Sequence, residues 1–369
     1  MGPLHGLRVI EMASIGPGPF AGMLLADLGA DVVRVEGRTS PVGIELGRRY
    51  DTMLRGRTAI SLDLKKPANV STVLKLAAEA DVFLEGWRPG VAERLGVGPA
   101  ECLARNPRLI YGRMTGWGQQ GPLASTPGHD INYLALSGAL HMVGRPGGPP
   151  TPPLNFVGDF GGGGMLLGFG VLAALWERTR SGSGQVVDAA MVDGASLLAT
   201  TFAGLFAAGL WNNERGTNLV DGGAPYYDAY ETADGRYFAI GAIENKFQDE
   251  LYRLLALDDL IGKPLTKHQW PQVKERVAAA IRTRTREEWR QVFEGTDTCT
   301  SPVLTPNEAP LHPHNLARAT FVNIDGITQP APAPRFSRTF ADLPSAPADC
   351  VPVDDVLKAW GVTADFESI

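Results

Sequence analysis

The sequence predicts an α/β protein with a doubly wound domain in its first half and a smaller α+β domain after it. Over the first 190 residues, short apolar runs of strand character alternate with helical patterns, which is typical of βαβ units. After about residue 212, a hairpin pattern is followed by three helical patterns. A chain of 369 residues can form two or three domains, and 44% hydrophobic with 20% charged residues is usual for a globular protein.

The first half is expected to open with a βαβ unit. Residues 7–12 and 31–36 are strand-like runs, and residues 19–28 between them have a helical pattern that begins at Pro19, a favoured residue in a first helical turn. Further strands are expected at 82–85, 109–113 and 185–188, and further helices at 70–80 and 160–180. Because helices separate the strands, the sheet is expected to be parallel.

The second half is expected to contain a hairpin and helices. Residues 226–231 and 236–240 flank an Ala-Asp-Gly turn, and helical patterns follow at 246–255, 272–282 and 286–293. Residues 302–334 are rich in proline and are expected to form an irregular linker. Residues 194–211 carry no charge, but they are rich in small residues and lack flanking basic anchors, so we expect a buried helix, within the chain or at a subunit contact, and no membrane span.

Charge and cysteine usage narrow the class of protein. The net charge of −6 argues against nucleic acid as the main partner. The three cysteines are isolated and form no CxxC pair, so neither a disulfide framework nor a zinc site is expected. No signal-peptide pattern precedes the first strand, and a reduced, cytoplasmic protein without a metal is the expectation.

The loop at 16–21 matches a dinucleotide-binding fingerprint in its letters, GPGPFA, and Glu36 follows at about the distance of a ribose-binding acid. That fingerprint works by aiming backbone N–H groups at a pyrophosphate. Pro17 and Pro19 each remove one such donor. We therefore interpret the loop as a turn into a helix and not as a nicotinamide site.

A basic segment offers a different way of binding phosphate. Residues 37–66 hold seven basic and three acidic residues within an acidic protein. Arg88 and Arg94 add two cations just after an expected strand end, where α/β folds bind ligands. Guanidinium groups pair with phosphate oxygens through two donors, so a polyphosphorylated ligand fits, although any single arginine here is equally explained as a solvated surface charge.

Two glycine-flanked turns carry proton-accepting side chains. The string GHDINY at 128–133 presents His129, and GDFGGGG at 158–164 presents Asp159, each before an apolar, helix-like stretch. Backbone N–H groups at a helix start have no partner within the helix and can stabilise a developing negative charge. Taken alone, His129 is also explained as a structural histidine and Asp159 as a helix N-cap. Together the two turns indicate proton transfer at a carbon acid.

Ordered motifs along the chain resemble the α-methylacyl-CoA racemases of the class III CoA-transferase superfamily. In the first half they are IGPGP at 15–19, LDLK at 62–65, RPGV at 88–91, ERLG at 93–96, GWGQ at 116–119, GHDINY at 128–133 and GDF at 158–160. Later ones are GQVVDA at 184–189, GGAPYY at 222–227, GAIE at 241–244 and APRFS at 333–337. The resemblance covers nearly the whole chain.

The resemblance implies an interlocked homodimer, in which each chain has a Rossmann-like large domain built from both termini and a small α+β domain inserted between. The implied boundaries are 1–190 for the large domain, 191–224 for a linker, 225–300 for the small domain, 301–334 for a second linker, and 335–369 for the return to the large domain. The acyl-CoA thioester is the implied partner, and CoA is part of the substrate, so no separate cofactor is expected.

The resemblance also implies the site residues. By that carry-over, CoA is bound by Arg38, Leu62, Asp63, Leu64, Lys65, Gly86, Trp87, Arg88 and Arg94, with Gly128, Asp130, Ile131, Asn132 and Tyr133 near the pantetheine end and the thioester. The family usually has an arginine directly after the acid of the second strand, whereas here Gly37 stands there and Arg38 follows.

The implied reaction is inversion of the α-carbon of a 2-methylacyl-CoA, and the residues suit it. Removal of a proton from one face and its return to the other needs two bases, which are His129 and Asp159. Glu244 is implied to pair with the histidine, and backbone N–H groups near Asp130 would stabilise the enolate. The alternative is a CoA-transferase on the same fold, in which Asp159 attacks the thioester as a nucleophile. The sequence does not specify the acyl chain.

Overall fold

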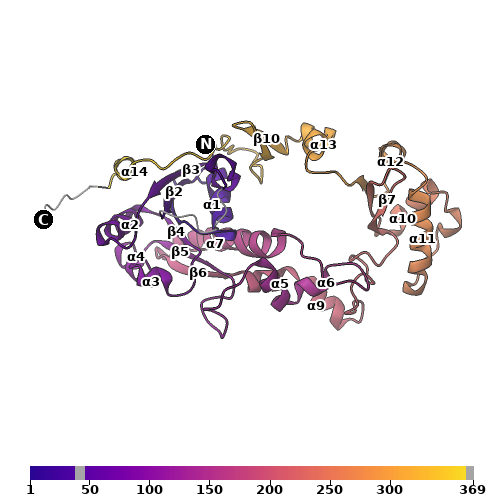
Figure 1. Ribbon diagram of the computed structural model, residues 1–369, viewed down its shortest axis with the longest axis horizontal. Helices are drawn as coiled ribbons and strands as arrows, with labels where there is room; N and C mark the ends of the chain where they lie inside the picture. The colour runs from indigo at the N-terminus through magenta and orange to yellow at the C-terminus, as the bar shows by residue number, and fades with distance from the viewer. Residues whose placement is uncertain (38–45, 363–369) are drawn as a thin grey trace. The chain divides into compact units, whose positions relative to one another are not determined.

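The computed structural model describes residues 1–37 and 46–362 and confirms the mixed α/β class (Figure 1). The chain forms two compact units. The first comprises Met1–Ser137, Leu154–Leu198 and Ala317–Ile369, and the second comprises Gly138–Pro153 and Ala199–Leu316. Three separate stretches therefore build the first unit, and two build the second.

A parallel sheet forms the centre of the first unit. Its strand order is β3-β2-β1-β4-β5-β6, and every neighbouring pair is parallel. The bounds are β1 Arg8–Met12, β2 Asp31–Glu36, β3 Arg57–Ser61, β4 Val82–Glu85, β5 Ile110–Thr115 and β6 Gln185–Ala190. The order reverses between β1 and β4, and ligands bind beyond the carboxyl ends of the strands at such a switch point. The sequence did not anticipate β3.

Successive side chains of the central strand β1 pack into two different apolar cores, one on each face of the sheet. Val9 packs with Leu25 and Leu167 on one face of the sheet, whereas Ile10 packs with Leu76 and Trp360 on the other. This alternation is the period of two expected for a strand that is buried on both faces. The helices of this unit are α1 Pro17–Asp27, α2 Pro67–Glu79, α3 Val91–Arg94, α4 Pro99–Arg105, α5 Asp130–Ser137, α7 Leu166–Ser181, α8 Met191–Leu198 and α14 Val353–Trp360.

The C-terminal stretch returns to the first unit. The indole N–H of Trp360, on α14, donates a hydrogen bond to Asp31 at 2.7 Å. The expectation of an irregular stretch at 302–334 is wrong, because β10 Phe321–Ile324 and β11 Ile327–Pro330 form a hairpin. Its turn is Asp325-Gly326, with both residues at positive φ. An Asp-Gly pair is a strong hairpin signal, and the surrounding prolines concealed it.

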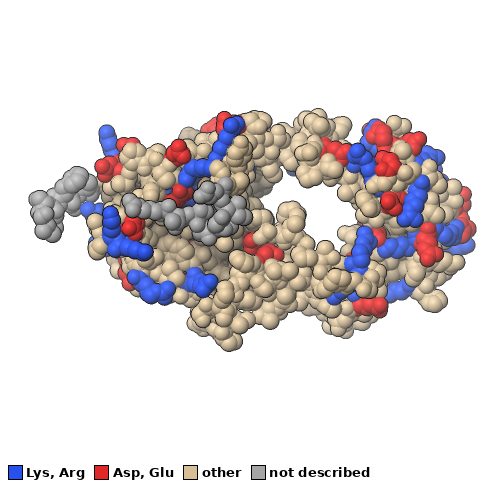
Figure 2. Space-filling view, viewed as in Figure 1, with Lys and Arg blue, Asp and Glu red and all other residues tan. Residues whose placement is uncertain are grey.

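The second unit combines an antiparallel sheet with a layer of helices. Strands β7 Tyr227–Glu231, β8 Tyr237–Gly241 and β9 Thr300–Pro302 pair in that order, and the sequence did not predict β9. The helices are α6 Ala139–Met142, α9 Thr200–Ala207, α10 Asn245–Leu254, α11 Trp270–Ile281, α12 Arg286–Phe293 and α13 Pro313–Ala317. Acidic and basic side chains lie intermixed on the surface around α10, α11 and α12 (Figure 2).

The remaining helical segments are short or irregular. They are η1 Arg48–Tyr50, η2 Thr52–Leu54, η3 Phe156–Met165, η4 Asp258–Leu260, η5 Lys267–Gln269 and η6 Ala309–Leu311. All are 3-10 helices except η3, which is a π-helix. A π-helix is rare in proteins and is often found at functional sites.

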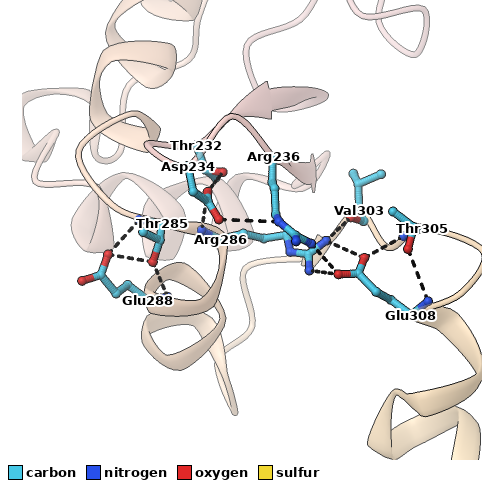
Figure 3. A network of polar contacts seen from close by, with 9 residues as sticks. All are labelled: Thr232, Asp234, Arg236, Thr285, Arg286, Glu288, Val303, Thr305 and Glu308. Carbon is cyan, nitrogen blue, oxygen red and sulfur yellow. Dashed lines mark hydrogen bonds and ion pairs between the residues drawn. The ribbon is translucent and has the colours of Figure 1, made fainter.

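A polar network links the hairpin turn of the second unit to helix α12. The Asp234 carboxylate accepts the N–H of Arg286 at the start of α12, and the Arg286 guanidinium pairs with Glu308 at 2.6 Å (Figure 3). Arg236, from the other side of the turn, also pairs with Glu308. The network ties three separate chain segments together at the surface.

Two expectations about long apolar segments need correction or refinement. Residues 194–211 do not form one buried helix: they are divided between α8 and α9, and α9, which is fully described, buries none of its side chains within this chain. The stretch Phe156–Ser181 is long and apolar enough to cross a membrane by length and composition only. Leu167, Val171 and Ala174 on its α7 part are buried against the sheet, as in a core helix.

Candidate active site

A cavity of about 630 Å³ lies at the carboxyl ends of β4 and β5. The loop before α1, the segment after β4, the segment after β5, and the starts of α5 and η3 all contribute to its wall. The lining includes Gly16, Pro17, Met53, Gly86, Trp87, Arg88, Met114, Trp117, Gly128, His129, Tyr133, Asn155, Asp159, Phe160 and Met191. Both expected bases therefore line one cavity, although they are thirty residues apart in sequence.

His129 is held at the cavity by the turn that precedes α5. Its backbone N–H donates to the Asn132 side chain at 3.0 Å, and its carbonyl accepts the N–H of Asn132 at 2.8 Å. The Tyr133 ring packs so closely on this turn that a Cβ at Gly128 would lie 2.7 Å from it, and the Tyr133 hydroxyl donates to the Gly128 carbonyl. The imidazole itself is exposed toward the cavity space.

Asp159 lies inside the first turn of η3. The N-cap of η3 is Asn155, which corrects the interpretation of Asp159 as a plain N-cap. The Asn155 side-chain amide donates to the Asp159 carboxylate at 2.6 Å. The Asp159 N–H is accepted by the Asp130 carboxylate at 2.7 Å. Asp159 therefore has a fixed backbone and a carboxylate that is held by one neutral donor.

The surroundings of Asp159 favour its protonated form. Burial raises the pKa of Asp159, and the nearby Asp130 charge raises it further, against the opposing effects of the Asn155 hydrogen bond and His129. Burial also raises the pKa of Asp130, although backbone N–H groups of Asp159 and Gly158 favour its charged form. A carboxyl group with a raised pKa can return a proton near neutral pH.

The glycines of η3 have a packing role. A Cβ at Gly162 would lie 2.7 Å from the Ala195 backbone, one at Gly163 would lie 2.8 Å from Pro17, and one at Gly164 would lie 2.6 Å from the Pro17 carbonyl. η3 therefore packs against α1 and α8 through bare backbone. Gly162, Gly163 and Gly164 thus face other helices, and none of them lines the first cavity.

A second cavity of about 470 Å³ adjoins the first through Trp87, which borders both. Its lining includes Glu36, Leu62, Asp63, Leu64, Lys65, Trp87, Val91 and Leu95. The indole N–H of Trp87 donates to the Ala13 carbonyl at 3.1 Å, and its backbone N–H donates to the buried Glu85 carboxylate at 2.8 Å. Trp87 is thus anchored to β4 and to the residue that directly follows β1, at the switch point of the sheet.

Most cations of the basic segment serve the fold and are not free to bind phosphate. Arg48 pairs with Glu36 at 2.7 Å, and Arg55 and Arg57 are buried in pairs with Asp27 and Glu11. Arg55 and Arg57 therefore fit neither expectation for the basic segment, because they are neither available to a phosphate nor solvated surface charges. The exposed Lys65 borders the second cavity. Arg38 lies outside the described residues.

Only some of the other expected CoA-binding residues line one of the two cavities. Arg88 is exposed and lines the first cavity, whereas the exposed Arg94 lines neither of the two. The side chains of Asp130, Ile131 and Asn132 also line neither cavity; Asp130 is buried behind Asp159. Glu244 belongs to the second unit, where it is exposed at the N-cap of α10.

The sequence interpretation missed several residues of the first cavity. Asn155 is the most consequential, because it bonds directly to the Asp159 carboxylate. Its position four residues before Asp159 was the available signal, since residues four apart lie on one face of a helix. Met53, from η2, and Gly16, whose Cβ would lie 2.9 Å from the Asp159 carboxylate, had no local signal of this kind.

A doubly wound sheet with two cavities at its switch point, one of them lined by two proton acceptors, defines an α/β protein with a ligand-binding site at the carboxyl edge of its sheet. The family model described as CoA-transferase family III matches residues 4–353. The chain therefore belongs to CoA-transferase family III.

Curated relatives and solved structures refine this assignment. The chain is 47% identical to the α-methylacyl-CoA racemase of Mus musculus over 94% of this chain and 89% of that protein, and 43% identical to the one of Homo sapiens over the same shares. It is 31% identical to a succinyl-CoA–D-citramalate CoA-transferase of Chloroflexus aurantiacus over 87% of this chain and 83% of that one. A CaiB/BaiF family protein from Brucella suis is 26% identical, with a TM-score of 0.78 over 97% of this chain and 99% of its own.

Proposed function

We propose that this protein is an isomerase that inverts the α-carbon of 2-methylacyl-CoA thioesters. One observation supports the proposal above others: a histidine and an aspartic acid with a raised pKa line the same cavity. The 47% and 43% identities to proteins named α-methylacyl-CoA racemase point to the same reaction.

In the proposed reaction, one base takes the α-proton and the electrons of the C–H bond move into the thioester to form an enolate. The other base then donates a proton to the opposite face, and the enolate electrons form the new C–H bond. His129 and Asp159 exchange these roles with the direction of reaction. Backbone N–H groups at the start of α5, beside Asp130, stabilise the enolate oxygen.

The CoA part of the substrate is proposed to occupy the second cavity. Lys65 supplies a cation there, Leu62, Asp63 and Leu64 also line it, and Trp87 with Gly86 leads into the first cavity. Arg88 at the first cavity faces the phosphates, with Arg94 nearby in α3 and Arg38 as a further phosphate ligand. Gly128, Ile131, Asn132 and Tyr133 belong to the turn that holds the thioester end.

We also propose that the active unit is an interlocked homodimer. The exposed apolar side chains on α7 support this: Phe169 is 73% exposed, Trp176 is 69% exposed, and Met165 just before the helix is 57% exposed. A patch of this kind on a soluble protein marks an interaction site. In the dimer, Glu244 would pair with His129 and orient its ring. Sedimentation equilibrium of Trp176→Glu tests this arrangement, because a shift toward monomer is expected and an unchanged mass argues against it.

A CoA-transferase reaction is the second candidate. Asp159 borders the cavity with one carboxylate oxygen bound to Asn155, so it could instead attack a thioester as a nucleophile. The 31% identity to a protein named as a CoA-transferase also supports this reaction. Incubation with an acyl-CoA and a free acid separates the two: CoA exchange supports transfer, and loss of optical activity without an acceptor supports racemisation.

The first prediction concerns His129. We expect His129→Ala to abolish exchange of the α-proton in D2O for one enantiomer of a 2-methylacyl-CoA, because general acid–base catalysis contributes about 10²–10⁴-fold. Nuclear magnetic resonance of both enantiomers measures the exchange. His5→Ala is the matched control, because His5 is exposed and lines neither cavity. Undiminished exchange from both enantiomers would exclude His129 as a base.

A further inference from the structure

We propose that the Asp130 carboxylate is a positioning residue that holds Asp159 in place and supplies the negative charge that makes it a proton donor. The inference rests on the proposed function, since it concerns the same two bases. It assigns a role to a buried side chain that touches neither cavity.

The start of η3 is capped by a side chain from another helix. The first N–H groups of a helix have no partner within it, and the side chain of the N-cap residue commonly accepts one of them. Asn155 makes no such bond and donates to the Asp159 carboxylate instead. The Asp130 carboxylate takes over the cap by accepting the N–H groups of Asp159 and Gly158. A residue of α5 therefore caps η3.

Close packing makes this contact specific. Asp130 is 7% exposed, and a Cβ at Gly158 would lie 2.3 Å from its Oδ1 atom. Glycine at position 158 is therefore required for the carboxylate to reach the helix start. Because His129 directly precedes Asp130 in the chain, one dipeptide both presents the first base and fixes the backbone of the second.

The charge of Asp130 acts on Asp159 against few opposing groups. From the neighbouring elements, His129 is the titratable group that favours the charged carboxylate, and Asn155 on η3 itself favours it through a neutral hydrogen bond. Tyr133 of α5 faces the same space, and burial raises its pKa to about 12, so it stays neutral. The loop before α1 contributes Gly16 and α8 contributes Met191, neither of which titrates, and the segment after β4 contributes Arg88, a cation that lines the same cavity.

The consequence follows from the sign of this interaction. A negative charge beside Asp159 disfavours loss of its proton, so removal of that charge lowers the pKa of Asp159. Where Asp159 acts as the base, the acid limb of the pH–rate profile then moves to lower pH. Where Asp159 acts as the donor, the rate at neutral pH falls several-fold.

The test uses two neutral replacements that keep a hydrogen-bond acceptor, Asp130→Asn and Asp130→Ser. We expect both to retain the cap and the fold and to shift the acid limb of α-proton exchange to lower pH. Asp193→Asn is the matched control, because Asp193 is an exposed carboxylate in the first turn of α8, and its profile should match the wild type. If the wild-type profile persists in a folded Asn or Ser variant, the proposal is overturned.

A second measurement separates this inference from the proposed function. The Asp159 carboxyl carbon can be titrated by ¹³C nuclear magnetic resonance in the wild type and in Asp130→Asn, with no substrate present. A lower pKa in the variant supports the role of Asp130 even if the wild type racemises nothing. An unchanged pKa overturns it even if racemisation is established.

Discussion

Two bidentate arginine–aspartate pairs in this protein have nearly the same geometry and opposite surroundings. In the first unit, Arg55 donates to Asp27 at 2.6 and 3.0 Å, and the two side chains are 4% and 1% exposed. In the second unit, Arg276 donates to Asp259 at 2.6 and 2.9 Å, and the side chains are 38% and 61% exposed. The comparison separates the effect of burial from that of geometry.

Burial decides what each pair contributes. The Arg55 guanidinium also donates to Gln329 of β11, so the buried pair joins α1 to the C-terminal hairpin. Loss of one partner leaves an uncompensated charge away from water. Around the exposed pair, water can replace either partner and salt screens the attraction. Hydrogen bonds of nearly the same length are therefore expected to have very different consequences for stability.

The largest effect is expected from Asp27→Ala. It leaves Arg55 buried without its carboxylate, and the expected loss is about 3–5 kcal/mol in the free energy of unfolding. Urea denaturation followed by circular dichroism measures the change. A loss no greater than that of Asp259→Ala, the same substitution at the exposed pair, would show that geometry and not burial governs these pairs.

An intermediate effect of opposite sign is expected from Asp159→Asn. Folding raises the pKa of Asp159 above its ordinary value of 3.8, so the wild type loses stability as pH rises through that value toward the folded-state pKa. The variant lacks this loss and should be more stable than the wild type at pH 8, by roughly 1 kcal/mol, as in other exchanges of activity for stability. Thermal unfolding at pH 8 and pH 3 checks this, and an advantage that persists at pH 3 would contradict the electrostatic explanation.

The smallest effect is expected from Asp259→Asn. Arg276 lowers the pKa of Asp259, so its pair stabilises the fold above the ordinary value of 3.8 and loses that contribution as pH falls through the lowered pKa. We expect a small drop in Tm at pH 7 that disappears in 1 M salt, where charges are screened within about 3 Å. A drop that survives high salt would indicate that the pair acts through packing.

Local pattern predicted much of the fold. The strands at 31–36 and 82–85 and the helix at 286–293 have the predicted bounds, because their apolar periodicity and the capping box at Thr285 are local signals. The missed β9 is a short strand paired through contacts far along the chain. Partners of that kind leave no periodic trace in the sequence.

In the site, too, local motifs predicted some residues, whereas others depend on contacts between distant segments. The sequence identified His129 and Asp159 as proton acceptors before helices, through their glycine-flanked motifs. It did not identify Asn155 as the partner of Asp159 or assign Arg55 and Arg57 to buried pairs. A residue type can be read from one position, whereas a charge's environment depends on every segment packed around it.

The sequence by itself determined the α/β class, the family motifs and the chemical identity of the two acceptors, because periodicity and residue type are properties of the chain. Only the tertiary structure decided which cations are buried, which cavity the acceptors share, and how Asp130 meets η3. The physical reason is that desolvation and Coulomb interactions depend on distance in space, and Asp130 reaches the Asp159 N–H across twenty-nine residues of chain.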